Sequence, residues 1–278
     1  MKKQILLVAV LAAAGLAFCA APGAAQGVPA LQASPTPNPY RLPEPVITPP
    51  PALPPIVHYD RFVEGGYIAP PLVCNQFSPC NPGNRYGSRA ARAAVEFPLI
   101  NTAVTGMVKV DYRTYGYTHP AGLITTPGGA GSAQLFTGAF GIRDTDVSYR
   151  AGVQLTGPKV YVAGAYLEQR STSGYPNLRG YGLGIEKLPD LNQIFSLYLS
   201  YYYYPTVKAD YYLPGAPNTI YRLSYHVSQY DFGVALKPST HSPIFVDVGY
   251  LGDKSKRGEN APSNITRNGP FVGLGVNF

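Results

Sequence analysis

The chain has 278 residues, 45% of them apolar, so it is long enough to fill a sizeable core. Only 13% are charged, against ~25% in a usual soluble domain, which disfavours an ordinary cytosolic globule. Thirty glycines, 29 prolines and 23 tyrosines indicate many turns and strands and disfavour a helical bundle. The formal net charge of +7 comes from scattered basic residues, so we expect no nucleic-acid binding.

Residues 1–25 have the pattern of a signal peptide. Lys2 and Lys3 precede an uncharged stretch that ends in small residues, so the mature chain is predicted to begin near Gln26. A single membrane anchor is the alternative, because the stretch is just long enough to span a bilayer. A third interpretation is lipidation of Cys19, because residues 16–19 resemble a lipoprotein box in which Phe18 replaces the usual small residue.

The cysteines left after export would lie in an oxidising compartment. Cys74 and Cys80 form an even pair close together in the chain, which predicts a short disulfide loop. None of the four histidines lies at metal-motif spacing from this pair, so we expect neither a metal site nor a cofactor.

Residues 26–58 are predicted to form an extended arm that is rich in proline between positions 34 and 55. Each proline removes a backbone donor and fixes φ, so neither helix nor sheet is expected there. A plain tether is one interpretation, and binding to a groove of a partner protein is the other. The arm side chains available for such binding are Tyr40, Leu42, Val46, Ile47 and Leu53.

Residues 59–278 alternate apolar and polar side chains between clusters of turn-forming residues, which predicts an all-β domain. About ten strands are expected, at 59–69, 89–99, 102–117, 145–156, 159–170, 178–188, 193–204, 219–237, 243–253 and 270–278. Short connections alternate with longer ones along the whole domain. This alternation is typical of an antiparallel up-and-down barrel with periplasmic turns and longer external loops.

The last strand carries a terminal motif. Val272, Leu274, Val276 and Phe278 share one face, opposite two glycines and an asparagine. Here the chain resembles bacterial outer-membrane β-barrel proteins, whose final strand alternates in this way and ends in an aromatic residue that the barrel assembly machinery reads.

This resemblance implies a transmembrane β-barrel that is exported to the outer membrane and contacts its lipid. It places the proline-rich arm in the periplasm and the disulfide loop outside the cell. A soluble β-sandwich, in which the apolar faces pack on each other, is the alternative architecture.

The same alternation assigns polar side chains to the interior of the barrel, with a suspected bulge near residues 228–230. Because buried charges need partners, we interpret these side chains as a salt-bridged plug, with a narrow ion path as the alternative. The predicted lumen residues are Glu96, Lys109, Asp111, Arg113, Arg150, Glu186, Arg222, His226, Asp231 and Asp247.

Two short patterns suggest hydrolytic chemistry. Asp144 and Asp146 are similar to the acidic pair with which omptins, the outer-membrane proteases, activate water, but the matching His-Asp couple is missing. His226 and Ser228 resemble the His-x-Ser pattern of outer-membrane lipid A deacylases, which lies on the lipid-facing side, and no supporting Glu is in phase. We expect that the protein is not an enzyme.

The sequence therefore predicts an outer-membrane barrel with a structural or interaction role, docked through its arm to a protein partner in the periplasm or outer membrane. A narrow small-solute channel and a surface adhesin are the alternatives, and a hydrolase is the third. The basic residues of the external segment 254–267 are either solvated or in contact with anionic lipopolysaccharide.

Overall fold

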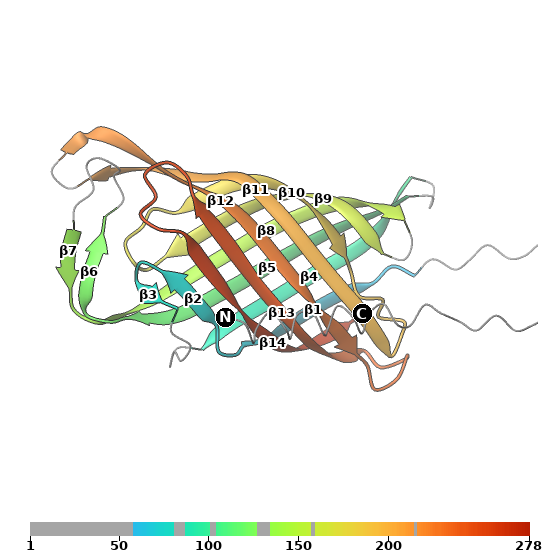
Figure 1. Ribbon diagram of the computed structural model, residues 1–278. Coiled ribbons are helices and arrows are strands. Elements are labelled where there is room, and N and C mark those ends of the chain that lie inside the picture. The colour runs from blue at the N-terminus through green and yellow to red at the C-terminus, as the bar shows by residue number, and fades with distance from the viewer. Residues whose placement is uncertain (1–57, 81–86, 101–103, 127–133, 157–158, 214–215) are drawn as a thin grey trace, which may run out of the picture. The chain divides into compact units, whose positions relative to one another are not determined.

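In the part of the chain that the structure describes, ten antiparallel strands close into a barrel (Figure 1). This computed structural model describes residues 58–80, 87–100, 104–126, 134–156, 159–213 and 216–278. The ring strands are β1 (Arg61–Ile68), β4 (Ser88–Ile100), β5 (Val104–His119), β8 (Phe140–Thr156), β9 (Val160–Ser171), β10 (Leu178–Lys187), β11 (Phe195–Leu213), β12 (Ala216–Leu236), β13 (Ile244–Arg257) and β14 (Ile265–Asn277).

Each ring strand pairs with the next one along the chain, and β1 pairs with β14 to close the ring. In that closing pair Phe62 lies opposite Asn277 and Ile68 lies opposite Phe271. The predicted antiparallel up-and-down barrel is confirmed. Within the described residues, no helix is long and apolar enough to cross a membrane. The predicted signal peptide, Cys19 and the arm residues Tyr40, Leu42, Val46, Ile47 and Leu53 lie outside the described residues.

We call the end of the barrel with the long connections the outer end and the opposite end the inner end. Two long connections contain hairpins: β2 (Leu72–Asn75) with β3 (Ser78–Pro79), and β6 (Gly122–Thr125) with β7 (Gln134–Thr137). β2 also pairs with β14, whereas β6 and β7 form a separate sheet. Figure 1 shows β6 and β7 beyond the same end of the barrel as the tips of β11 and β12.

The disulfide between Cys74 and Cys80 is present and closes the first hairpin, as predicted. The predicted loop at 205–218 is largely strand instead, because β11 and β12 continue past the neighbouring strands as a two-stranded ribbon. Tyrosines have high β propensity, and the rings of Tyr211 and Tyr221 pack across this ribbon with centroids 5.9 Å apart.

The outward face of the strands is an apolar surface. Its exposed side chains include Val63, Val95, Val108, Val153, Leu183, Ile185, Leu197, Leu199, Phe232, Val246, Val248 and the terminal-motif residues Val272, Leu274, Val276 and Phe278. In a soluble sandwich these side chains would pack against a second sheet, whereas here the single closed sheet turns them outward. The β-sandwich architecture is therefore excluded.

Strand β12 is regular, which corrects two predicted lumen residues. β12 pairs with β13 without a register shift, so the suspected bulge at 228–230 is absent. Asp231 points into the barrel, and residues an odd number of positions away on a regular strand must point outward. Arg222 and His226 are accordingly exposed and do not belong to the lumen.

The bulge lies in β11. Pairing of β11 with β12 shifts between Tyr204 and Val207, and pairing with β10 shifts between Tyr203 and Thr206. Pro205 and Thr206 are consecutive and both face outward. Tyr204 and Val207 on either side of them point inward and are fully buried. Proline has no backbone N–H to give to a ladder, so a bulge is a place where a strand tolerates it.

Candidate functional site

Charged and aromatic side chains fill the interior of the barrel. The predicted lumen residues that are buried there are Glu96, Lys109, Asp111, Arg113, Arg150, Glu186, Asp231 and Asp247. Further buried charged residues, which the sequence interpretation did not assign to the lumen, are Asp60, Glu64, Arg92, Asp144, Asp146, Lys159, Lys237, Asp253 and Arg267. Strand phase could have predicted some of them. Arg92 lies an even number of residues from Glu96, and Asp253 lies an even number from Asp247, so each pair shares the inward face.

Arg92 is the centre of a cluster in which one guanidinium serves three carboxylates. Its Nη1 lies 2.7 Å from Glu64 Oε1 and 3.0 Å from Asp247 Oδ2, and its Nη2 lies 2.8 Å from Asp231 Oδ2. The guanidinium also lies over the ring of Phe271, 4.7 Å from the centroid. Because all these groups are buried, Glu64 and Asp247 depend on Arg92 for their counter-charge, whereas Asp231 Oδ2 also lies 3.7 Å from Arg113 Nη2.

A second cluster joins the middle of β5 and β8 to Glu186 near the end of β10. Asp111 Oδ2 accepts from Arg113 Nη2 at 2.8 Å and from Arg150 Nη2 at 3.0 Å. Arg150 Nη1 lies 3.3 Å from Glu186 Oε2, and Lys109 pairs with the other oxygen of Glu186. These ion pairs join β5 and β8 to each other and to β10, and their side chains fill the space inside this part of the barrel.

The inner end is closed by an ion-paired cluster around Lys159. Lys159 Nζ pairs with Asp60 and lies 2.9 Å from Glu96 Oε2. Tyr161 donates its hydroxyl proton to Glu96 Oε1 at 2.5 Å. All of these side chains come from strand ends near the short connections, so the plug extends to the inner end of the barrel.

Arg267 is the centre of the outermost cluster. Its Nη2 lies 2.7 Å from Asp146 Oδ2 and 2.9 Å from Asp253 Oδ2, and its Nη1 lies 3.4 Å from Asp144 Oδ2. The acidic pair that is similar to that of omptins is therefore bound to an arginine. The Oδ1 atoms of Asp144 and Asp146 are buried without a hydrogen-bond partner in the described part of the chain.

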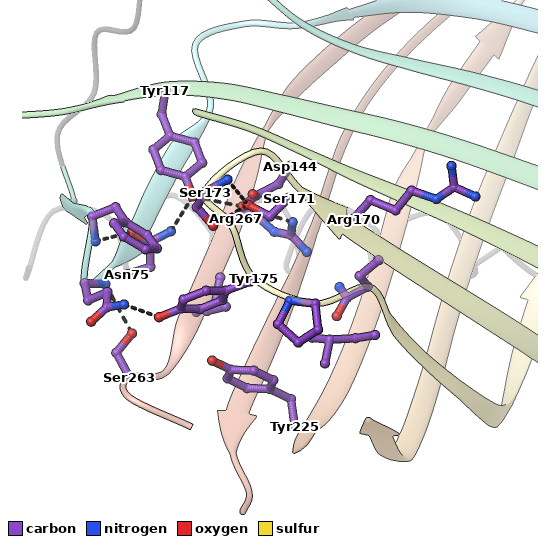
Figure 2. A pocket seen from close by; sticks show the side chains of 16 residues that line it. Asn75, Tyr117, Asp144, Arg170, Ser171, Ser173, Tyr175, Tyr225, Ser263 and Arg267 are labelled. Atoms are coloured by element: carbon purple, nitrogen blue, oxygen red, sulfur yellow. Dashed lines mark hydrogen bonds and ion pairs between the residues drawn. The ribbon is translucent and has the colours of Figure 1, made fainter. Parts of the chain in front are cut away.

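A pocket of about 40 Å³ lies beside this cluster (Figure 2). The hydroxyl of Tyr117 donates to Asp144 Oδ2 at 3.0 Å and accepts from Asn75 Nδ2 at 2.9 Å. Figure 2 shows this chain of hydrogen bonds, with Tyr175 and Tyr225 on the other side of the pocket. A space of this size accommodates a few water-sized groups.

The disulfide hairpin contacts other connections at the outer end through two residues, Gln76 and Phe77. Gln76 donates from its backbone to Ser263 Oγ at 3.1 Å, exchanges two hydrogen bonds with the backbone of Thr125, and donates to the hydroxyl of Tyr175. Phe77 is 3% exposed and packs against the ring of Tyr175, with centroids 5.5 Å apart. Burial raises the pKa of Tyr175, so its hydroxyl stays protonated and able to donate.

The histidines do not complete the acidic pair. His119 is buried near the outer end, where its ring nitrogens contact the carbonyl of Phe77 at 2.9 Å and the hydroxyl of Thr137 at 3.0 Å. His226 Nδ1 contacts the carbonyl of Pro205 on the exposed face, and Ser228 Oγ accepts from Tyr201 at 3.4 Å. His226 and Ser228 thus face outward, which is the side implied by the resemblance to deacylases. Among the described residues, no group of three or more His, Cys, Asp or Glu is arranged to hold a metal ion.

The barrel, its apolar exterior and its ion-paired interior define the class of bacterial outer-membrane β-barrel proteins. No family model matches the chain, and no curated protein matches its sequence. Among solved structures, the chain is similar to the outer membrane protease OmpT from Escherichia coli. The two share 11% sequence identity over 79% of this chain and 93% of that chain, with a TM-score of 0.36.

This comparison corrects our expectation that the protein is not an enzyme, because the matching chain is a protease. At this identity and TM-score, the match does not assign that activity to this chain.

Proposed function

We propose that the protein is exported to the bacterial outer membrane, where it has a structural or interaction role and docks to a protein partner through residues 26–58. The observation that carries this proposal is the filled interior. Ion-paired clusters lie around Lys159 at the inner end of the barrel, around Arg267 at the outer end, and around Arg92 and Arg150 in between. A barrel of this kind offers its exterior and its arm, rather than its centre, for contact with other molecules.

The membrane location is supported by the exterior. Apolar side chains face outward along every ring strand for which the structure describes them, and lipid is the solvent that such a surface requires. Tyr149, Tyr166 and Tyr181 form a row across β8, β9 and β10, with neighbouring ring centroids 6.4 and 5.1 Å apart. Such rows are typical of membrane interfaces, where the ring meets apolar chains and the hydroxyl meets water.

Co-purification with and without the arm tests the docking. We expect a stoichiometric partner after gentle detergent extraction of the full chain, and loss of that partner when residues 34–55 are deleted. The matched control keeps the arm prolines and replaces Tyr40, Leu42, Val46, Ile47 and Leu53 with serine. Loss of the partner in this control assigns binding to the side chains. A lone barrel in every preparation would contradict the docking.

Planar-bilayer recording tests the channel alternative. Because buried ion pairs occupy the barrel centre, we expect the conductance to stay at baseline after insertion. Stepwise openings of the full-length protein would contradict the plug and favour the channel.

A surface adhesin is a second candidate, favoured by the β6–β7 hairpin. Leu123 and Phe136 lie opposite each other on this hairpin and are 62% and 75% exposed, outside the ring of the barrel. Exposed pairs of this size mark contact surfaces. If adhesion is the function, Leu123→Ser with Phe136→Ser abolishes attachment of cells to a surface and leaves the amount of barrel unchanged.

A further inference from the structure

The Arg267 cluster at the outer end carries more negative than positive charge. Its three carboxylates, those of Asp144, Asp146 and Asp253, pair with the one arginine, and in the ranges that the structure describes none of them forms an ion pair with a second cation. One guanidinium among three carboxylates leaves a surplus of two negative charges. All four side chains are buried, so water screens this surplus poorly. The cluster therefore attracts a further cation.

The arginines that line the adjoining pocket are not available to an anionic ligand. Arg267 Nε lies 3.2 Å from Asp253 Oδ1, and its two other nitrogens face the remaining carboxylates of the cluster. Arg170 is exposed, and its Nη2 lies 2.9 Å from Glu168 Oε1. An anion that entered the pocket would meet carboxylates and paired arginines. The pocket is therefore suited to a cation.

Two buried oxygens of the pocket are free to accept a hydrogen bond. Asp144 and Tyr225 line the pocket and are 5% and 1% exposed. Asp144 Oδ1 and the hydroxyl of Tyr225 have no hydrogen-bond partner among the residues that the structure describes. The hydroxyl of Tyr117, by contrast, already donates to Asp144 Oδ2 and accepts from Asn75. Because a buried polar atom is costly when unpaired, these two oxygens point to a ligand that donates hydrogen bonds.

Aromatic rings form the walls of the pocket. Phe77 and Tyr175 line it with ring centroids 5.5 Å apart, and Figure 2 shows Tyr225 on the same side as Tyr175. Aromatic faces attract cations and pack against alkyl chains. The volume of about 40 Å³ holds about three water-sized groups, which is the size of an ammonium with two methylene groups. Ser173 and Ser263 also line the pocket and are half-buried, so it reaches the surface.

We propose that this pocket binds a small primary alkylamine in its ammonium form. The ammonium donates to Asp144 Oδ1 and to the hydroxyl of Tyr225, and the alkyl chain lies along the rings of Phe77 and Tyr175. A quaternary ammonium has no N–H to donate, and an inorganic cation has no chain for the aromatic walls. Gln76 and Phe77 of the disulfide hairpin line the pocket, which favours a small free amine over the lysine side chain of a peptide. This site goes beyond the proposed docking through the arm and does not depend on it.

Titration of the full-length protein in detergent micelles at constant ionic strength tests the site, with binding followed by NMR of the ligand. The probe is n-propylammonium. The comparison ligands are n-propanol, tetramethylammonium, potassium and a tripeptide with a central lysine, each scored by competition with the probe. The test variant is Tyr225→Phe. The matched control is Tyr211→Phe, which also removes a hydroxyl without a partner in the described part of the chain but does not line the pocket.

We expect Tyr225→Phe to bind n-propylammonium about tenfold more weakly than the unmodified protein, because a hydrogen bond to a charged group is lost. Tyr211→Phe should stay within about twofold. Asp144→Asn, which keeps the shape of the side chain and removes its charge, should lose at least as much affinity as Tyr225→Phe. The mobility shift between unheated and boiled samples confirms that each variant is folded. No loss in Tyr225→Phe, or an equal loss in Tyr211→Phe, overturns the site even if Asp144→Asn does not fold.

The comparison ligands test each part of the assignment. We expect n-propylammonium to bind at least tenfold more tightly than any of them. Equal binding of n-propanol overturns the role of the charge, and equal binding of tetramethylammonium overturns the hydrogen bonds. Equal binding of potassium means a site for inorganic cations, and tighter binding of the tripeptide means a site for peptides; either result overturns the proposal. Loss of the arm partner is measured by co-purification, so its failure is distinguishable from failure of this site.

Discussion

At two places in the barrel, a single arginine is paired with several carboxylates. Arg92 and Arg267 each serve three buried carboxylates, and each also lies against an aromatic ring, Phe271 for the first and Tyr115 for the second. In a low-dielectric interior an unpaired carboxylate is far more costly than in water. The free energy of folding therefore depends strongly on these two arginines.

Replacing Arg267 with methionine should reduce the free energy of unfolding by about 3–5 kcal/mol, because Asp144, Asp146 and Asp253 lose their shared partner. Urea unfolding in detergent micelles measures the change. Arg222→Met is the control, since this exposed ion pair contributes about 1 kcal/mol or less. Equal losses in both variants would show that the buried cluster contributes no more to the free energy of unfolding than an exposed ion pair.

Glycine at position 184 is required by close packing. A Cβ at Gly184 would lie 2.3 Å from the carbonyl oxygen of Tyr201 and 2.5 Å from a ring carbon of Tyr202. Gly184→Ala should therefore cost about 1–3 kcal/mol in the same unfolding measurement. At Gly164, on the outward face of β9, a Cβ meets nothing within 4 Å, so Gly164→Ala should be neutral or slightly stabilising. A larger loss at Gly164 would contradict the packing.

At the scale of the strand, the bulge in β11 joins two segments whose inward-facing residues differ in phase. On β12 the single residue His226 stands opposite both Pro205 and Thr206. Even-numbered residues of β11 up to Tyr204 point inward, whereas from Val207 onward the odd-numbered residues do. Without the extra residue, the pairing would continue one to one.

Deletion of Thr206 should leave a folded barrel, because Tyr204 and Val207 then alternate regularly with Pro205 between them. Deletion of Val248 in β13 should abolish folding, because β13 pairs with both neighbours without a register shift and a slip of one residue turns the following side chains to the wrong face. The shift in electrophoretic mobility between unheated and boiled samples reports the folded form. Loss of that shift on deleting Thr206 would mean that the bulge itself is needed.

At the scale of the whole molecule, the ring closes within residues 61–277. We therefore expect a protein without residues 26–58 to form the same barrel, with an unchanged mobility shift and an unchanged β-type circular dichroism spectrum. The control is a variant that also lacks β1, which leaves β4 and β14 with unpaired edges and should not fold. Failure of the arm deletion alone to fold would assign the arm a part in the barrel.

The sequence by itself determined the strands and their closure. Alternation of apolar and polar residues has a period of two in any strand, and turn-forming residues separate the strands, so both can be recognised locally. Eight of the ten predicted lumen residues followed from the same phase. The disulfide followed from the close spacing of Cys74 and Cys80 in the chain.

Tertiary structure alone decided which charges meet. Asp247 is 155 residues from Arg92, and Asp146 is 121 residues from Arg267, so these contacts exist only because the sheet closes on itself. Strand phase shows which residues point inward, but not which strand faces which across the barrel. The position of the bulge was also decided by tertiary structure. A register shift is a relation between neighbouring strands, and the sequence of either strand alone gives only a weak signal of it.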